Sequence, residues 1–256
     1  MIMILMMSSL QQYLEDYGEK DYWDERYVKD IVKRPHFDWY HGYKTLKPFL
    51  QKFFKRQDKI MMLGCGNSAL GEDMNLDHYL DIVNIDFSSV IIQDMIERTK
   101  GRVGLEYLTM DGRNMEFPNE YFDSIFDKGT IDAVMCSDSD NQNAVKMVAE
   151  VARVLKPGGY FVVMTYGAPE GRMPLFQVAD YNWSIEMRML GTHENAQMNE
   201  CHYAYILKKN NIIIENGDAA SSTDDNDTDT NQEEEFKVYL NSSIGKVPLE
   251  IIPIVK

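Results

Sequence analysis

The sequence predicts an α/β protein with a Rossmann-like, mostly parallel seven-stranded sheet, a C-terminal antiparallel hairpin and helices on both faces. Two observations lead to this fold class. From residue 59 onward, short apolar runs alternate with helical segments, and repeated β-α-β units place parallel strands side by side. Two later runs, 183–190 and 201–208, are separated by a polar loop and predict an antiparallel pair. At 256 residues, the chain is long enough for one such domain with extensions.

The N-terminal part predicts helices that carry aromatic side chains. Residues 8–30 have a polar, helical pattern in which Trp23 and Tyr27 are four residues apart and share one face. These rings either dock the helix on the core or form a lid over a flat or cationic ligand. An aromatic break at 35–40 precedes a second helix, roughly 42–56, whose apolar face predicts packing against the sheet.

The central part carries the alternation that defines the sheet. Strand-like runs are found at 60–63, 82–86, 105–108, 122–126 and 160–165. Helical segments are expected near 69–77, 88–99, 142–155 and 173–180. This pattern predicts a right-handed, doubly wound sheet.

The C-terminal part divides into a polar and an apolar segment. Residues 211–235 are of low complexity and strongly acidic, which predicts a linker without regular structure. The apolar residues 236–256 include Pro248 and Pro253 and suit an edge strand or an extended arm. We expect this tail to fold back on the domain or to dock on a partner. The predicted units are a helical aromatic lid (1–58), a core (59–210), an acidic linker (211–235) and an apolar tail (236–256).

Net charge and cysteine content limit the classes of function. The formal net charge is −15, and nucleic-acid binding is carried mainly by Lys and Arg. The charge therefore excludes a typical nucleic-acid binder and favours a basic partner or simply high solubility. The three cysteines, Cys65, Cys136 and Cys201, have no C-x-x-C spacing, so we expect no zinc site, no disulfide framework and a reducing compartment. The apolar start, residues 1–7, is too short to cross a bilayer, and we expect a cytoplasmic protein.

Four motifs follow successive predicted strands and are therefore expected at the carboxyl edge of the sheet, where such folds bind ligands. The glycine turn Gly64-Cys65-Gly66 lacks the third glycine of a dinucleotide fingerprint. Asp86 suits a ribose diol or, alternatively, caps the next helix. Asp111 and Gly112 suit an adenine ring or, alternatively, form an ordinary turn. The fourth motif covers residues 126–133.

Together these motifs resemble class I S-adenosylmethionine-dependent methyltransferases. The resemblance rests on GCGNS at 64–68, VNID at 83–86, MDGR at 110–113, DKGTIDA at 127–133 and VLKPGG at 154–159. The resemblance is more specific to the branch that includes lysine methyltransferases of translation elongation factor 1-alpha. This branch is also matched by DYWDERY at 21–27, FDWY at 37–40 and YNWS at 181–184. The resemblance extends over residues 20–208.

The resemblance implies S-adenosyl-L-methionine as cofactor and a role for each matching residue. It implies that Gly64 approaches the methionine part, that Asp86 binds the ribose hydroxyls, and that Asp111 and Gly112 bind adenine. The residues implied to close over the cofactor or to contact it are Trp23, Tyr27, Trp39 and Lys128. For Lys128 the alternative is a surface lysine paired with Asp127 or Asp132.

The function expected from the resemblance is N-methylation of a protein lysine, on elongation factor 1-alpha or a similar basic protein. No general base is identified. Asp127 and Asp132 are candidates to guide the incoming cation, and Thr130 or Tyr166 to orient it. A small-molecule methyltransferase of the same fold and a methyltransferase-like structural subunit of a larger complex are the alternatives. The chain has no Asn/Asp-Pro-Pro-aromatic motif and no cysteine after a proline, which argues against adenine-N6 and cytosine-C5 methylation.

Overall fold

A computed structural model describes residues 16–137, 140–191 and 201–211, together with the backbone of two short strands at 238–239 and 248–253. Its strands are β1 (Ile60–Leu63), β2 (Ile82–Asp86), β3 (Leu105–Thr109), β4 (Phe122–Lys128), β5 (Leu155–Thr165), β6 (Trp183–Gly191), β7 (Cys201–Lys209), β8 (Val238–Tyr239) and β9 (Pro248–Pro253). Its α-helices are α2 (Lys20–Lys33), α3 (Tyr43–Leu50), α4 (Leu70–Leu76), α5 (Ser89–Arg98), α6 (Thr130–Cys136), α7 (Gln142–Val154) and α8 (Pro169–Phe176), with short 3-10 turns at Asp16–Gly18 and Ala179–Tyr181.

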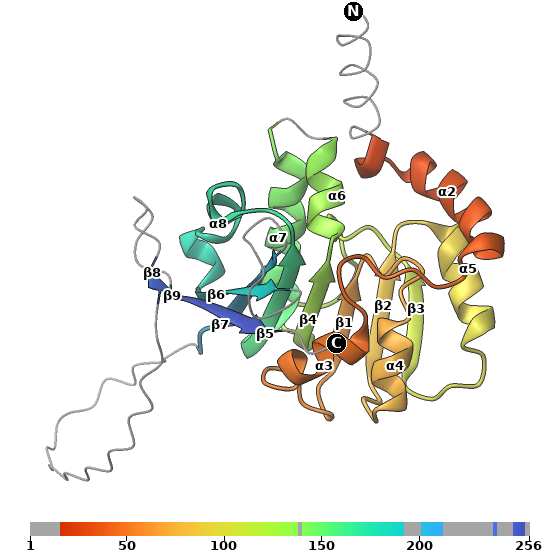
Figure 1. Cartoon of the computed structure of the whole chain (residues 1–256), viewed down its shortest axis with the longest axis horizontal. Coiled ribbons are helices and arrows are strands. Elements are labelled where there is room, and N and C mark those ends of the chain that lie inside the picture. The colour runs from red at the N-terminus through yellow and green to blue at the C-terminus, as the bar shows by residue number, and fades with distance from the viewer. Residues whose placement is uncertain (1–15, 138–139, 192–200, 212–237, 240–247, 254–256) are drawn as a thin grey trace, which may run out of the picture.

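All nine strands belong to one sheet, in the order β3-β2-β1-β4-β5-β7-β6-β9-β8. The pairs within β3-β2-β1-β4-β5 are parallel, and β7 runs antiparallel to β5 and to β6. The predicted fold class is confirmed in β1 to β7, and β9 and β8 extend the sheet at its outer edge. The chain moves from β1 to β3 in one direction and then returns to place β4 on the other side of β1 (Figure 1). This reversal is the topological switch point at which folds of this class bind ligands.

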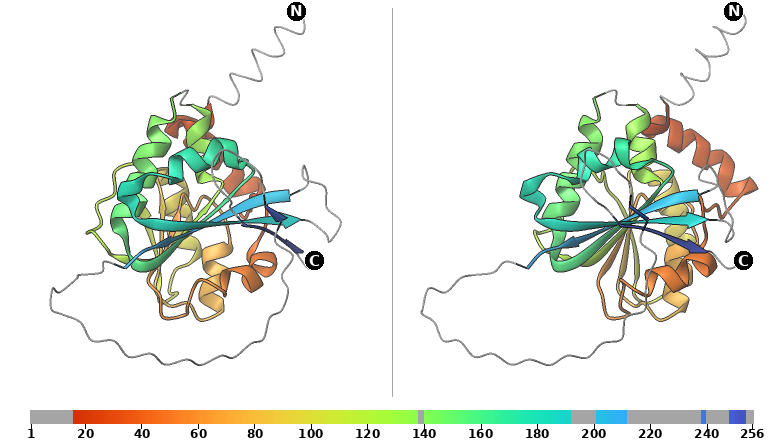
Figure 2. Two further views of the ribbon diagram at one scale, coloured as in Figure 1. Left: turned by 90° about the vertical axis from the view of Figure 1, so that its left-hand side faces the viewer. Right: turned by 60° about the vertical axis from the view of Figure 1, so that its left-hand side comes forward.

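The core consists of two apolar layers, because successive residues of a strand point to opposite faces of the sheet. All four residues of β1 are buried. Met61 and Leu63 pack in the cluster that contains residues of α7 and α8, whereas Ile60 and Met62 pack in the cluster that contains residues of α3 and α4. Such a continuous apolar strand is typical of a parallel sheet that is covered by helices on both faces, as Figure 2 shows.

Several predicted boundaries differ from those observed. The first helix, α2, begins at Lys20, and residues 8–15 of the predicted helix lie outside the described residues. The last of the four helical segments predicted for the core, α8, begins at Pro169 rather than near residue 173, because proline at the first helical position favours a helix start. Helix α6 is an element that the sequence pattern did not predict. Strand β5 begins at Leu155 rather than near residue 160.

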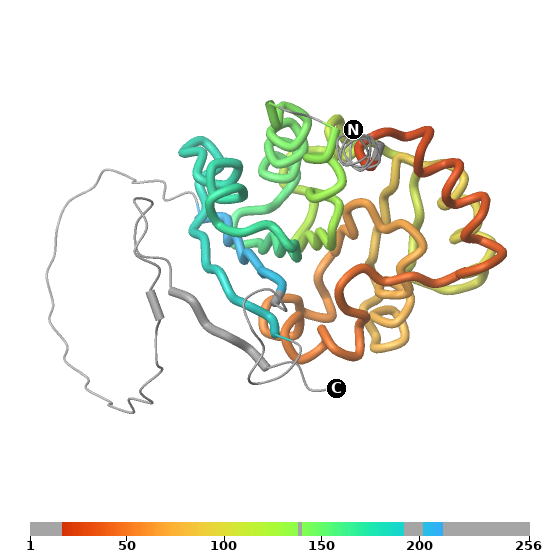
Figure 3. Tube along the Cα trace, turned by 45° about the horizontal axis from the view of Figure 1, so that its top comes forward, coloured from red at the N-terminus to blue at the C-terminus, as the bar shows by residue number. Residues whose placement is uncertain are grey.

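A strap of residues 34–42 links α2 to α3 across the carboxyl edge of the sheet (Figure 3). Its backbone is bound to the turn after β1: the Phe37 N–H donates to the Asn67 carbonyl at 3.2 Å, and the Asn67 side chain donates to the Arg34 carbonyl at 2.9 Å. The Ser68 hydroxyl also donates to the Asp38 carboxylate. The strap is therefore held along its length by the loop that it covers.

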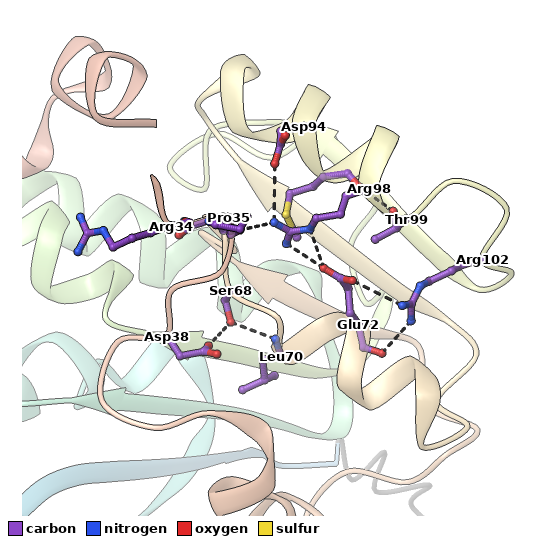
Figure 4. A network of polar contacts seen from close by, with 12 residues as sticks. Arg34, Pro35, Asp38, Ser68, Leu70, Glu72, Asp94, Arg98, Thr99 and Arg102 are labelled. Carbon is purple, nitrogen blue, oxygen red and sulfur yellow. Dashed lines mark hydrogen bonds and ion pairs between the residues drawn. The ribbon is translucent and has the colours of Figure 1, made fainter. Parts of the chain in front are cut away.

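A second set of contacts holds the strap from the side of α4 and α5 (Figure 4). Arg98 of α5 donates to the Pro35 carbonyl and forms an ion pair with Glu72 of α4 at 2.8 Å. Arg102 donates to the backbone carbonyl of Glu72 at 3.4 Å. Because the Glu72 side chain is buried, this ion pair fixes the relative position of the two helices and the strap. Within the described part of the chain, every helix is too short or too polar to traverse a bilayer.

Candidate functional site

The turn after β1 has backbone conformations that only glycine adopts at little cost. Gly64 and Gly66 have φ angles of +62° and +50°, in the left-handed region. A Cβ atom on Gly64 would lie 2.2 Å from Oγ1 of Thr130, and one on Gly66 would lie 2.8 Å from the hydroxyl of Tyr27. The Thr130 hydroxyl also donates to the Leu63 carbonyl at 2.9 Å. The turn is therefore in direct contact with α6 on one side and α2 on the other.

Asp86 ends β2 beside this turn and lines the same cavity. Its Oδ2 accepts a hydrogen bond from the Gly66 N–H at 2.9 Å, and its Oδ1 accepts one from the Ser88 N–H at 2.9 Å. Burial raises the pKa of Asp86 to about 6, although these two hydrogen bonds act in the opposite direction. Each carboxylate oxygen keeps a further acceptor position. Asp86 can therefore position the turn and accept hydrogen bonds from a diol in the cavity.

Asp111 and Gly112 follow β3 at the far side of Asp86. Arg113 donates to both carboxylate oxygens of Asp111, with Nη2 2.7 Å from Oδ2. Burial acts to raise the pKa of Asp111, but the hydrogen bonds from Arg113 hold it below its usual range. A Cβ on Gly112 would lie 2.7 Å from Cδ1 of Leu63, so the backbone here lies directly on the apolar core. Asp111 and Gly112 both line the cavity, and the absence of a side chain at Gly112 allows the chain to pack on Leu63.

The aromatic residues of α2 both pack on the core and line the cavity, the two roles that the sequence left open. Trp23 and Tyr27 are 8% and 5% exposed and belong to a buried cluster that includes Ile92 of α5. Both also line the cavity, with ring centroids 5.5 Å apart. Trp39 of the strap is 36% exposed and lies at the cavity as well. The rings dock α2 on the core and at the same time cover the carboxyl edge.

Lys128, at the end of β4, is bound to the strap. Its Nζ donates to the Asp38 carboxylate at 2.8 Å and to the Trp39 carbonyl at 3.0 Å. Its ion-pair partner is therefore Asp38, and not Asp127 or Asp132 as in the alternative drawn from the sequence. Burial lowers the pKa of Lys128, with Asp38 acting against that shift.

The eight residues implied to bind the cofactor come together around one cavity. They are Trp23, Tyr27, Trp39, Gly64, Asp86, Asp111, Gly112 and Lys128. Of the four substrate-side candidates, Thr130 lines this cavity, whereas Asp127, Asp132 and Tyr166 are not among its lining residues.

Asp127 is fully buried below α6. Its oxygens accept hydrogen bonds from the N–H groups of Thr130 at 3.0 Å and of Ile131 at 3.1 Å. Burial, followed by the nearby carboxyl of Asp132, raises the pKa of Asp127 to about 8. In this structure the carboxyl holds the start of α6, and it is not exposed to an approaching acceptor.

Asp132 is also buried, and three side chains surround it. Arg172 forms an ion pair with it, Thr165 donates a hydrogen bond to Oδ1, and the Tyr40 hydroxyl donates one to Oδ2 at 2.7 Å. Tyr40 has a φ angle of 61°, which is costly for an aromatic residue. Its ring packs on His202 with centroids 4.4 Å apart. Asp132 therefore holds Tyr40 in a strained conformation beside the cavity.

Tyr166 is 57% exposed and follows β5 at the same edge of the sheet. The Arg172 guanidinium lies 5.7 Å from the centre of its ring. Tyr166 therefore presents an exposed aromatic ring next to Arg172, the ion-pair partner of Asp132. It does not line the cavity.

Arg26 was not predicted as a site residue, although it lines the cavity. Its guanidinium carbon lies 5.1 Å from the ring centre of Trp23 and 5.3 Å from that of Trp39. A signal was present in the sequence, because residue 26 is three positions after Trp23 and so shares its helix face.

The cavity as a whole has the groups that an adenosine derivative with an amino-acid extension requires. It offers a buried carboxylate for a diol, a backbone edge at Gly112 for a base, and a glycine turn open to close approach. The residues present therefore fit S-adenosylmethionine. Among the described residues, no three or more His, Cys, Asp and Glu side chains form a group that could hold a metal ion.

The chain is similar in sequence to known methyltransferases. Residues 61–163 match the family model described as a methyltransferase domain. EEF1A lysine methyltransferase 4 of Mus musculus is 32% identical over 177 residues, covering 66% of this chain and 69% of the relative. The Bos taurus protein of the same name is 33% identical over 183 residues, covering 68% and 71%. The Homo sapiens eEF1A lysine and N-terminal methyltransferase is 38% identical over 162 residues, covering 62% of this chain and 23% of the relative.

Solved structures agree in fold at low sequence identity. A SAM-dependent methyltransferase from Methanosarcina mazei is similar with a TM-score of 0.53 and 18% identity, covering 68% of this chain and 99% of that chain. A phosphoethanolamine N-methyltransferase from Haemonchus contortus is similar with a TM-score of 0.55 and 15% identity, covering 77% and 60%.

The glycine turn generates a prediction with an internal control. Gly64→Ala and Gly101→Ala both place alanine at a positive φ angle, but a Cβ at Gly101 meets no atom within 4 Å. Each substitution should lower the free energy of unfolding by about 1–2 kcal/mol through the left-handed backbone. Gly64→Ala should cost about 1–3 kcal/mol more, because Thr130 must move. Denaturant unfolding of both variants measures the difference, and equal losses would show that Thr130 does not constrain the turn.

Proposed function

The chain belongs to the family of S-adenosylmethionine-dependent methyltransferases that includes EEF1A lysine methyltransferase 4, and we propose that it methylates a lysine of elongation factor 1-alpha or of a similar basic protein. The observation that carries this proposal is the agreement over two thirds of the length of relatives with that name. The convergence of the eight expected residues on one cavity supports it from the structure. The net charge of −15, of which nine acidic residues lie at 215–235, favours a basic protein acceptor or simply high solubility.

We assign the cavity residues as follows. Asp86 accepts from the ribose hydroxyls, and Asp111 with the backbone of Gly112 binds adenine. The Gly64 turn allows the methionine part to approach the backbone, while Lys128 contacts the cofactor and fixes the strap over it. When bound, S-adenosylmethionine supplies an electrophilic methyl group.

The side of the cavity at α6 is the proposed acceptor side. A lysine acceptor must lose its proton, and with a usual pKa near 10.4 this costs about 4 kcal/mol at pH 7.4. Removal of the amine from water lowers that pKa. Asp127 and Asp132 are buried and hydrogen-bonded, so we propose that they shape the α6 side rather than accept the proton. Thr130 and Tyr166 are left as the candidates to orient the acceptor.

The remaining assignments extend the proposal to the whole chain. We propose that residues 59–210 form the catalytic core, that 1–58 serve as its lid, and that 211–235 act as a linker to the apolar tail 236–256. We also propose a cytosolic location. Strand β9 of the tail pairs with β6, so this part of the tail folds back on the domain, and we propose that a partner docks at the sheet edge that it forms. The sequence predicts that the linker 211–235 lacks regular structure, and residues 212–235 lie outside the described part of the chain.

The role of Asp86 predicts a specific pH dependence of ligand binding. The ionised carboxylate is the stronger acceptor for the ribose, so affinity for S-adenosylhomocysteine should fall roughly tenfold per pH unit below about pH 6. Asp86 itself does not destabilise the free protein in that range. Because its folded pKa is raised above its unfolded value, its contribution to stability is fully present below about pH 4 and is lost as the pH rises through 6.

Calorimetric titrations between pH 5 and 8 test this dependence. Asp86→Asn should weaken binding about 100-fold at pH 7.5 and flatten the pH profile. The matched control is Asp81→Asn, a half-exposed carboxylate immediately before β2 at its opposite end, which should leave both unchanged. Wild-type affinity in Asp86→Asn would remove Asp86 from the cofactor site.

The acceptor class is tested by methyl transfer. Purified chain, isotopically labelled S-adenosylmethionine and purified elongation factor 1-alpha should yield labelled methyl-lysine in the factor by peptide mass spectrometry. Asp86→Asn should reduce the yield at least tenfold. A lysate in which the label enters a small molecule would favour the small-molecule alternative. Co-purification with a stable complex and no labelled acceptor would favour the structural subunit.

A further inference from the structure

Arg26 stands out among the charged residues that line the cavity, which are Arg26, Asp86, Asp111, Arg113 and Lys128. Arg113 is paired with Asp111 at 2.7 Å, and Lys128 is paired with Asp38 at 2.8 Å. These two cations are therefore neutralised by neighbouring carboxylates. The charge of Arg26 is less completely neutralised by its neighbours.

Within the described ranges, the one ion-pair partner of Arg26 is Asp30, which also pairs with Arg34. Its Nε lies 3.3 Å from Oδ2 of Asp30, while Nη2 of Arg34 donates to both oxygens of Asp30 at 2.9 and 3.2 Å. Two guanidinium groups and one carboxylate leave a net positive charge at this end of α2. Nη1 of Arg26 makes a long contact of 3.4 Å to the Tyr22 hydroxyl, and the side chain also interacts with the Tyr17 hydroxyl. These contacts use fewer than the five N–H donors of a guanidinium group. Arg26 can thus donate to a further acceptor.

The order of the strands places Arg26 relative to the proposed cofactor. The strand order β3-β2-β1-β4 puts Asp111, which follows β3, at one end of the cavity and Gly129, which follows β4, at the other. A Cβ on Gly129 would lie 3.7 Å from Cβ of Trp39, so Trp39 is at the β4 end. The Arg26 guanidinium lies 5.3 Å from the Trp39 ring. The Arg26 guanidinium therefore lies within reach of the β4 end of the cavity, which is opposite to the end at Asp111.

We propose that Arg26 recognises the carboxylate of the amino-acid end of the cofactor; this inference rests on the proposed function of the cavity. An adenosine held by Asp86 and Asp111 leaves its amino-acid extension to run toward β1 and β4. The extension carries a carboxylate, and a guanidinium binds carboxylates through two parallel hydrogen bonds. Asp86 and Asp111 have the same sign of charge as that carboxylate and cannot serve.

The aromatic rings prepare Arg26 for this role. The guanidinium lies within 5.1 Å of the Trp23 ring, 5.3 Å of the Trp39 ring and 5.9 Å of the Phe37 ring. Cation–π contacts of this kind hold the side chain in place before a ligand binds, which reduces the entropy lost on binding. The same contacts also define the competing explanation, in which Arg26 only clamps α2 to the strap.

Ligands that differ in the carboxylate separate the two explanations. Calorimetry on the full chain would compare S-adenosylhomocysteine with its decarboxylated analogue, 5′-(3-aminopropylthio)-5′-deoxyadenosine, which keeps the adenosine, the sulfur and the amine. The wild type should bind S-adenosylhomocysteine about 10- to 100-fold more tightly. Arg26→Met should lose that preference and bind the analogue within about twofold of the wild type. Arg26→Lys should retain part of the preference, because it keeps the charge but not the two parallel donors.

The control is Lys29→Met, which removes an equal charge from an exposed position of the same helix that is not among the residues lining the cavity; it should keep the full preference. An equal loss of affinity for both ligands in Arg26→Met would overturn the proposal in favour of the clamp, as would a wild type without preference. If Arg26→Met is unfolded by circular dichroism, an undiminished preference in Arg26→Lys would overturn it instead. Failure of the wild type to bind either ligand would overturn the proposed function together with this inference.

Discussion

The hydrogen bond from the Gly66 N–H to the buried carboxylate of Asp86 is the contact on which the geometry of the site depends. It joins the turn after β1 to the end of β2, and the Cys65 N–H adds a second link to the Ile85 carbonyl at 2.9 Å. The turn cannot relax, because both of its glycines are in the left-handed region and each faces a side chain from another element. The Asp86 carboxylate therefore fixes the turn after β1 against the end of β2, next to the backbone ladder that joins the two strands.

The strap adds to this edge a cover that is held by charge as well as by packing. Asp38 accepts from Ser68 on the glycine loop and from Lys128 on β4, so a single carboxylate links both sides of the cavity. Arg98 fixes the beginning of the strap from α5. Ionic contacts of this kind contribute little net stability, but removal of one partner leaves the other charge unpaired, which is strongly destabilising. The cover is therefore a defined element and not a loose loop.

The sequence predicted the sheet well, because apolar runs and turns are local signals. It also placed the glycine turn, Asp86 and Asp111 at one edge, since motifs after parallel strands must meet there. The sequence did not predict contacts between residues that are distant in the chain. The ion-pair partner of Lys128 is Asp38, 90 positions away, and no local pattern around Asp38 indicates this contact. Helix α6 was missed because its start looks like a loop, although the Asp127 carboxylate accepts from the first N–H groups of this helix. The inward orientation of Asp127 and Asp132 follows from packing alone.

The central claim is that one ligand joins the sheet edge to the strap, and amide hydrogen exchange tests it most directly. With S-adenosylhomocysteine added, exchange should slow in the loops 64–68 and 110–113 and in the strap 34–42, while β6 and β7 at the other side of the sheet should be unchanged. Bound ligand stabilises the segments that it contacts. Protection of the loops without the strap, or protection confined to β6 and β7, would contradict the account.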